Sequence, residues 1–277
     1  MKKGAGKLLG LLIVCCAFAQ HISAQGNLLV APIRVVFENG NTKEDLNLTN
    51  IGQDTAIYLI SYIQNNMLPD GSFKQVENPD TLTTKVDKFV RIVPRKVTLP
   101  PGQSQTVRLQ YRKTADMKSG EYRSHLYFRA EKDVTALGMS TNKADSGSMS
   151  VSITPIFGIS IPVIIREGTL NYKTTLSDVV FTPADSVSFL SVKINRTGNR
   201  SSYGNLRVEF VPNSGASYIV TQANGVGVYT NITSRSFVFQ IRNQPGRVLK
   251  NGKLVIRYML SREEGEAELS KVEFQIP

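Results

Sequence analysis

The stretch from residue 151 to residue 165 reads VSITPIFGISIPVII, and it decides the fold class. Alternate side chains of a β-strand share one face, and here every second residue is apolar. These apolar positions are Val151, Ile153, Pro155, Phe157, Ile159, Ile161, Val163 and Ile165. At about 3.3 Å per residue the row would span roughly 50 Å, whereas a usual strand has about 5–6 residues. The pattern predicts a long β-strand with one apolar face.

The length of this row leaves two interpretations open. A single sandwich cannot easily bury it, so part of the row would be available to another chain as a donated strand, with main-chain hydrogen bonds supplying affinity. Alternatively, Pro155, Gly158 and Pro162 bend the stretch into shorter pieces that all belong to the core.

Outward from this stretch the hydrophobic period is two almost everywhere, and we find no long segment with a period of 3.6. Short strands separated by Gly, Pro and Asn turns predict an all-β protein. The order of elements repeats weakly, since LNLTNIG at 46–52 is answered by VKINRTG at 192–198. We therefore predict two β-sandwich domains, at 25–166 and 167–277, and a polar, turn-rich stretch at 65–88.

The N-terminus has three lysines, an apolar run over 8–19, and then small residues. This predicts a signal peptide over residues 1–24, with cleavage after Ala19 or Ala24, and no stable membrane insertion of the mature chain. Cys15 and Cys16 lie inside the apolar run, where they are apolar fillers or, alternatively, a lipid-attachment site.

Removal of the signal changes the charge and the chemistry of the chain. The formal charge is +11, and loss of three lysines leaves 30 basic and 22 acidic residues, a net charge of +8. No cysteine remains and His125 is the remaining histidine, which argues against disulfides, thiolate or histidine catalysis and a multi-histidine metal site. We predict no enzyme, no cofactor and no metal.

Single polar residues add little to this prediction. We interpret Asp87, Asp116 and Glu121 as surface or turn carboxylates. His125 lies in a predicted strand, and we expect it to be exposed or hydrogen-bonded rather than a ligand.

A basic run lies between residues 88 and 115, which include no acidic residue. Its members are Lys88, Arg91, Arg95, Lys96, Arg108, Arg112 and Lys113. The run is either a solvated strand face or a surface that attracts an acidic partner. No nucleic-acid-binding motif accompanies it, so we predict no nucleic-acid partner.

Several motifs of the first half resemble those of one known family. They are IRVVF at 33–37, LNLTN at 46–50, LPPGQSQTVRL at 99–109, and GEYRSHLYF at 120–128, followed by the alternating row. These motifs resemble the periplasmic pilus-assembly chaperones of the chaperone–usher pathway, the PapD-like family. The resemblance covers residues 28–166 well and rests on order and length beyond residue 167.

The resemblance implies two immunoglobulin-like β-sandwich domains and a partner, an incomplete fibre or pilus subunit that lacks its last strand. The strand at 151–163 would complete that subunit, with donor residues Val151, Ile153, Phe157, Ile159, Ile161 and Val163. Arg34 stands at the family's anchoring arginine, which grips the subunit's C-terminal carboxylate. An outer-membrane usher is a further implied partner, and the periplasm is the implied location.

One departure from the family concerns its second anchoring cation. The family's lysine on the last strand of the first domain is missing, and the register places Pro162 there. Arg95, Lys96 or Arg123 could supply the second charge. The alternative to a chaperone is a structural or adhesive surface protein with two immunoglobulin-like modules. Such a protein could be attached to the membrane as a lipoprotein.

Overall fold

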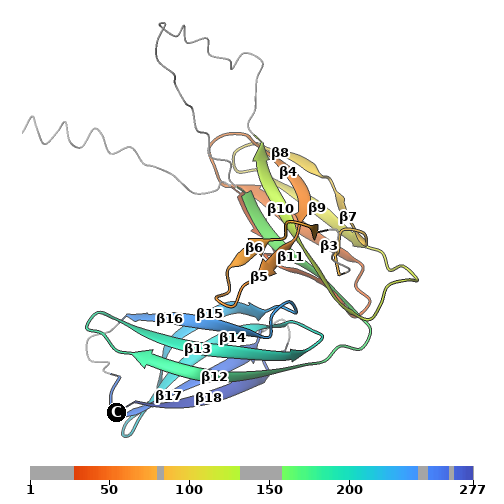
Figure 1. Cartoon of the computed structure of the whole chain (residues 1–277). Coiled ribbons are helices and arrows are strands. Elements are labelled where there is room, and N and C mark those ends of the chain that lie inside the picture. The colour runs from red at the N-terminus through yellow and green to blue at the C-terminus, as the bar shows by residue number, and fades with distance from the viewer. Residues whose placement is uncertain (1–27, 80–83, 132–157, 243–248, 262–264, 277) are drawn as a thin grey trace, which may run out of the picture.

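The computed structural model describes residues 28–79, 84–131, 158–242, 249–261 and 265–276. The regular elements in these ranges are β-strands, grouped in two sandwiches that lie one above the other (Figure 1). Within the same ranges, no helix is long and apolar enough to cross a membrane. The predicted all-β fold class is confirmed.

The first sandwich contains two sheets with strand orders β1-β3-β9-β7 and β2-β11-β10-β4-β8. The strands are β1 (Leu28–Ala31), β2 (Val35–Phe37), β3 (Lys43–Asn50), β4 (Ala56–Ile63), β7 (Val90–Val93), β8 (Lys96–Leu99), β9 (Ser104–Tyr111), β10 (Gly120–Glu131) and β11 (Gly158–Glu167). The first two strands lie in different sheets, so the chain changes sheet between Ala31 and Val35. This order is that of an immunoglobulin-like sandwich.

Period-two alternation places the core of the first sandwich. On β3 the side chains of Leu46 and Leu48 are fully buried, while Asp45 and Asn47, which alternate with them, are exposed. The same alternation on β9 buries Val107 and Leu109 against residues of the opposite sheet. Burial of such side chains is the dominant favourable term in folding.

Two of the resembling motifs meet in the fold, at the turn between β8 and β9. The side-chain amide of Asn50 donates to the carbonyl oxygens of Leu99 and Asp54, both at 2.8 Å. The amide of Gly102 donates to the Asn50 carbonyl at 2.9 Å, and Gly102 has a φ of 69°. Glycine adopts this left-handed conformation without steric cost, so the PPG turn closes against the end of β3.

The second sandwich has the sheet orders β12-β13-β16 and β15-β14-β17-β18. Its strands are β12 (Tyr172–Thr182), β13 (Val187–Gly198), β14 (Ser202–Pro212), β15 (Tyr218–Val228), β16 (Ser234–Arg242), β17 (Gly252–Leu260) and β18 (Glu268–Ile276). Strand β13 lies between β12 and β16 in its sheet, as β3 lies between β1 and β9 in the first sandwich. Val192 and Ile194 on β13 are fully buried, as Leu46 and Leu48 are on β3. The weak sequence repeat therefore marks equivalent strands.

A separate apolar cluster joins the two sandwiches. Ile164 of β11, Met67 and Tyr229 are buried together, at 0%, 3% and 5% exposure, with Val36 and Ile232 packed against them. Ile164 lies on the outer face of its sheet, because its neighbours Val163 and Ile165 belong to the core of the first sandwich. The outer face of β11 and β2 is thus an interface with the second sandwich.

Candidate functional site

Arg34 lies in the bend between β1 and β2, at the mouth of the cleft between the sandwiches. Its guanidinium carbon is 4.1 Å from the ring centroid of Tyr203 on β14, a cation–π contact between the two domains. A pocket of about 790 Å³ opens here. Its lining includes Ile33, Arg34, Glu38 and Glu44 of the first sandwich and Tyr203, Asn205 and Ser261 of the second.

Arg123, a candidate for the second cation, lies in the interface between the domains. Its guanidinium carbon is 4.2 Å from the ring centroid of Tyr229. One terminal nitrogen donates to the side-chain oxygen of Asn231 at 2.9 Å and to the carbonyl of Asn65 at 3.3 Å. Burial lowers the pKa of Arg123 and raises that of Tyr229. Arg123 therefore stabilises the interface, and its hydrogen bonds hold it beside Tyr229.

The other two candidate cations lie on different surfaces. Lys96 on β8 forms an ion pair of 2.7 Å with Glu131 on β10. Arg95 lines a groove beside β7. Of the three candidate cations, Arg123 is the one whose charge acts on the pKa of Tyr229. The charge of Arg34 acts on the same group, so the fold brings these two arginines near one ring.

The predicted donor row is divided by the structure. Ile161 and Val163, at 3% and 0% exposure, are packed in the core of the first sandwich, and Ile159 packs against that core. Val151, Ile153 and Phe157 lie outside the described residues. Because Ile161 and Val163 fill their own sandwich, they are not accessible to a partner, and the prediction that included them is corrected at its C-terminal end.

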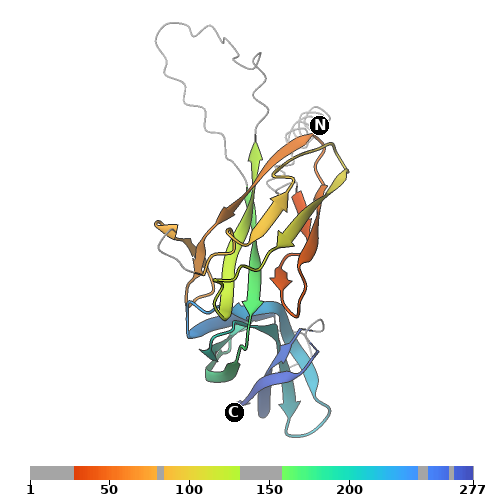
Figure 2. The same ribbon diagram turned by 90° about the vertical axis from the view of Figure 1, so that its right-hand side faces the viewer.

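The backbone of β11 is open along part of one edge. On one side β11 pairs with β10 over its whole length, from Gly158 to Glu167, and Figure 2 shows these strands running along the first sandwich. On the other side β2 pairs with it, in parallel, over Val163–Ile165 alone. Among the described strands none pairs with the Gly158–Pro162 part of that edge. The parallel register places Arg34, the residue before β2, beside Pro162.

Glu121, interpreted above as a surface or turn carboxylate, is instead buried at 5% exposure. Its Oε2 accepts hydrogen bonds from the backbone amide of Ser201 at 3.0 Å and from the Ser201 hydroxyl at 2.7 Å. Arg166, also buried, donates to Glu121 at 3.4 Å and to Glu38 at 2.9 Å. This group links the first sandwich to the turn before β14 in the second. Nothing in the spacing of these residues points to it.

The polar stretch at 65–88 contains a hairpin of β5 (Asn65–Met67) and β6 (Phe73–Gln75), which lies between the sandwiches (Figure 1). The amide of Asn231 donates to the Met67 carbonyl at 2.8 Å, and the backbone amide of Ser236 donates to the Pro69 carbonyl at 2.7 Å. The hairpin, an extension of the first domain, is therefore fastened to the second.

His125 on β10 lies under this hairpin and is neither exposed nor hydrogen-bonded. It is 3% exposed, and neither ring nitrogen has a hydrogen-bond partner among the described residues. The ring of Phe73 contacts it edge-on, with centroids 5.3 Å apart. Burial, together with the nearby charge of Arg123, lowers the pKa of His125 to about 4.

We expect the pKa of His125 to make folding sensitive to mild acid. The unfolded chain has an imidazole pKa near 6.5, so between pH 6.5 and 4 it binds more protons than the folded chain. Stability therefore falls as the pH drops through this window, by about 2.5 kcal/mol at pH 4.5. The check is urea unfolding at pH 7 and pH 4.5 for the wild type and His125→Phe, which keeps the ring and cannot titrate. Equal acid sensitivity of the two proteins would contradict the prediction.

Comparison with known proteins gives matches among solved structures. No protein-family model matches the chain, and no curated protein matches its sequence. The YadV chaperone is 12% identical, with 90% of this chain and 100% of that one covered and a TM-score of 0.44. The class 5 fimbriae chaperone CfaA is 20% identical, with 91% and 100% covered and a TM-score of 0.41. The CsuC–CsuE chaperone–subunit complex of Acinetobacter baumannii is 14% identical, with 90% of this chain and 98% of that one covered and a TM-score of 0.42.

In structure, the chain is similar to pilus chaperones. Identities are at most 20% among these three structures. The strand orders given above independently define both domains as immunoglobulin-like sandwiches.

Proposed function

We propose that this protein is a non-enzymatic periplasmic chaperone that binds an incomplete subunit of a secreted fibre and presents it to an outer-membrane usher. One observation carries the proposal: the open edge of β11, over Gly158–Pro162, ends beside Arg34. Both features belong to the motifs that resemble the PapD-like family.

The geometry supports a definite mode of binding. A partner strand that runs parallel to β11 along its open edge has its C-terminal end beside Arg34. A guanidinium is always charged and can bind a carboxylate with two parallel hydrogen bonds. The carboxylate at the end of the subunit's last strand would bind Arg34, while β11 and residues upstream of Gly158 would complete the subunit's sheet.

The burial of Ile161 and Val163 revises the donor segment. Their side chains fill the chaperone's own core, so side chains that enter the subunit must come from residues before them. Val151, Ile153 and Phe157 stay candidates for this role. Arg34 is the proposed anchor. Arg123 contacts Tyr229 in the apolar interface between the domains, so we assign it a structural role and not that of a second anchor.

Capture of subunits from periplasmic extracts tests this function. Tagged wild-type protein should retain small β-rich subunits, identified by mass spectrometry, and Arg34→Ala should retain at least about 10-fold less, since a charge-assisted hydrogen bond contributes roughly 1.5–3 kcal/mol. Arg242→Ala, at an exposed arginine of the second domain, is the matched control. If the wild type retains no subunit, or if its mature N-terminus is lipid-modified and membrane-bound, the structural or adhesive alternative is favoured.

A further inference from the structure

The proposed function does not use the basic run at 88–115, and ion pairs account for only part of it. Arg108 binds Asp45 through two nitrogens, at 2.8 and 2.9 Å. Lys113 pairs with Glu167, and Lys96 pairs with Glu131. Their charges are therefore neutralised locally.

The other four cations of the run converge on one site. Lys88, Arg91, Arg95 and Arg112 line a single groove beside β7, and Lys43 of β3 joins them. All five are exposed, and none has an ion pair with a carboxylate in the part of the chain that the structure describes. Asp87 is the acidic residue in the lining. We call this site, defined by its five cations, the basic groove.

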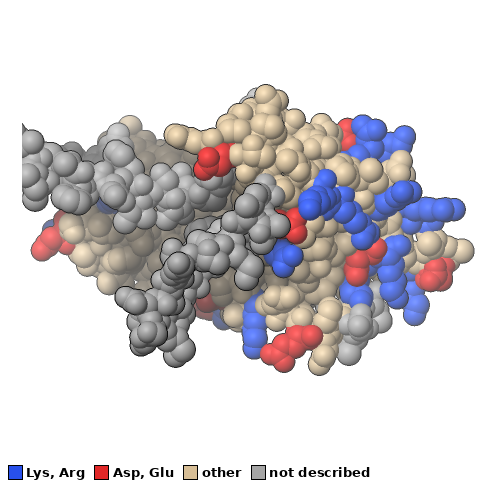
Figure 3. Space-filling model, turned by 90° about the horizontal axis from the view of Figure 1, so that it is seen from above, with Lys and Arg blue, Asp and Glu red and all other residues tan. Residues whose placement is uncertain are grey.

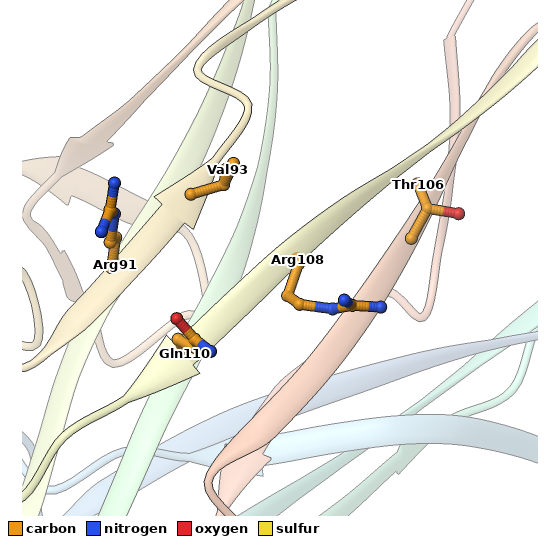
Figure 4. A pocket seen from close by; sticks show the side chains of 5 residues that line it. All are labelled: Arg91, Val93, Thr106, Arg108 and Gln110. Atoms are coloured by element: carbon orange, nitrogen blue, oxygen red, sulfur yellow. The ribbon is translucent and has the colours of Figure 1, made fainter.

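The groove continues along the outer face of the sheet. Arg91 and Gln110 line it and also line the neighbouring hollow over β7 and β9, together with Val93, Thr106 and Arg108 (Figure 4). Seen from above, Lys and Arg side chains gather on the side of the first sandwich where Figure 1 shows β7 and β9 (Figure 3). This surface shares no lining residue with the pocket at Arg34.

We infer that the basic groove binds an acidic, extended polypeptide segment of a partner protein. Unpaired guanidiniums in a concave site match carboxylates in charge and in hydrogen-bonding geometry. Thr42, Thr106 and Gln110 add neutral hydrogen-bonding groups for a peptide backbone, and Val93, 47% exposed, adds an apolar contact. A single-stranded nucleic acid would call for exposed aromatic rings that stack on bases, but the groove's aromatic residues, Phe89 and Tyr111, are half-buried and pack against the core.

A defined peptide tests the inference by fluorescence anisotropy. The probe is a labelled peptide of alternating Glu and Ser, and the matched peptide has Gln in place of Glu. The wild type should bind the Glu peptide, more weakly as ionic strength rises, and should not bind the Gln peptide. The triple variant Arg91→Glu, Arg95→Glu, Arg112→Glu should lose at least 10-fold in affinity, with its urea midpoint unchanged because all three side chains are exposed.

A second triple variant separates the groove from general positive charge. Arg129→Glu, Arg207→Glu, Arg242→Glu makes the same change in net charge at exposed arginines elsewhere, and it should bind the Glu peptide within about twofold of the wild type. Equal weakening by the two triple variants would overturn the inference. So would binding of polyphosphate or phosphatidylglycerol vesicles in place of the peptide. Failure of subunit capture would leave this result unaffected, because the groove and the Arg34 pocket are separate.

Discussion

Replacement of Glu121 by alanine is expected to lower the free energy of unfolding by about 3–5 kcal/mol, the range for breaking a buried ion pair from one side. The Glu121 side chain is 0% exposed and accepts hydrogen bonds from Ser201 and Arg166. Its removal leaves the buried Arg166 with the partly exposed Glu38 as an acidic partner, and it removes the two hydrogen bonds from Ser201, which are among those that link the sandwiches. Urea unfolding at neutral pH measures the loss.

Glu38→Ala is the matched control for this prediction. Glu38 also pairs with Arg166, but its side chain is 30% exposed, so the expected loss is no more than about 1 kcal/mol. The double variant Glu121→Ala, Arg166→Met should recover part of the stability, because it also removes the buried Arg166 charge that Glu121 no longer balances. A loss for Glu121→Ala no larger than that for Glu38→Ala would contradict the buried role of Glu121.

Tyr229→Ala is expected to cost about 3–5 kcal/mol and to separate the unfolding of the two sandwiches. Tyr229 packs with Met67 and Ile164, lies under the Arg123 guanidinium, and contacts Phe73 with ring centroids 5.9 Å apart. Its loss leaves a cavity at the centre of the apolar interface, for which aromatic-to-alanine changes have costs of this size. Calorimetry should then show two transitions where the wild type shows more cooperative unfolding.

Tyr229→Phe keeps the ring and tests whether the packing, rather than the hydroxyl, couples the domains. We expect it to stay within about 1 kcal/mol of the wild type, with no separation of transitions. Coupled unfolding in Tyr229→Ala would show that the interface does not depend on this cluster, and the hairpin contact between Met67 and Asn231 would then be the next candidate.

Much of the fold could be predicted from local patterns, because a strand's periodicity reports its buried face. Leu46 and Leu48 are predicted inside and are found there, and the equivalent pattern at Val192 and Ile194 marks the matching strand of the second sandwich. The long apolar row was ambiguous, since periodicity identifies an apolar face but not what covers it. The folded structure shows that Ile161 and Val163 pack in their own core.

The candidate site could be predicted only in part. The resemblance singled out Arg34, which lies where the open edge of β11 ends. The roles of Glu121, His125 and the β5–β6 hairpin were missed, because each depends on residues far away in the chain. Ser201 follows Glu121 by 80 positions and Asn231 follows Met67 by 164, so no local pattern reports these contacts.

The all-β class and the inward-facing positions follow from the local sequence, because side-chain alternation and turn residues act within a few residues of each other. Which charges are neutralised and which are buried depends on how the strands and domains pack. The local sequence pattern of a strand arginine is the same whether the arginine forms an ion pair with an aspartate, as Arg108 does, or lines an open groove, as Arg91 does. Those outcomes depend on strand pairing and domain packing, which bring distant residues together.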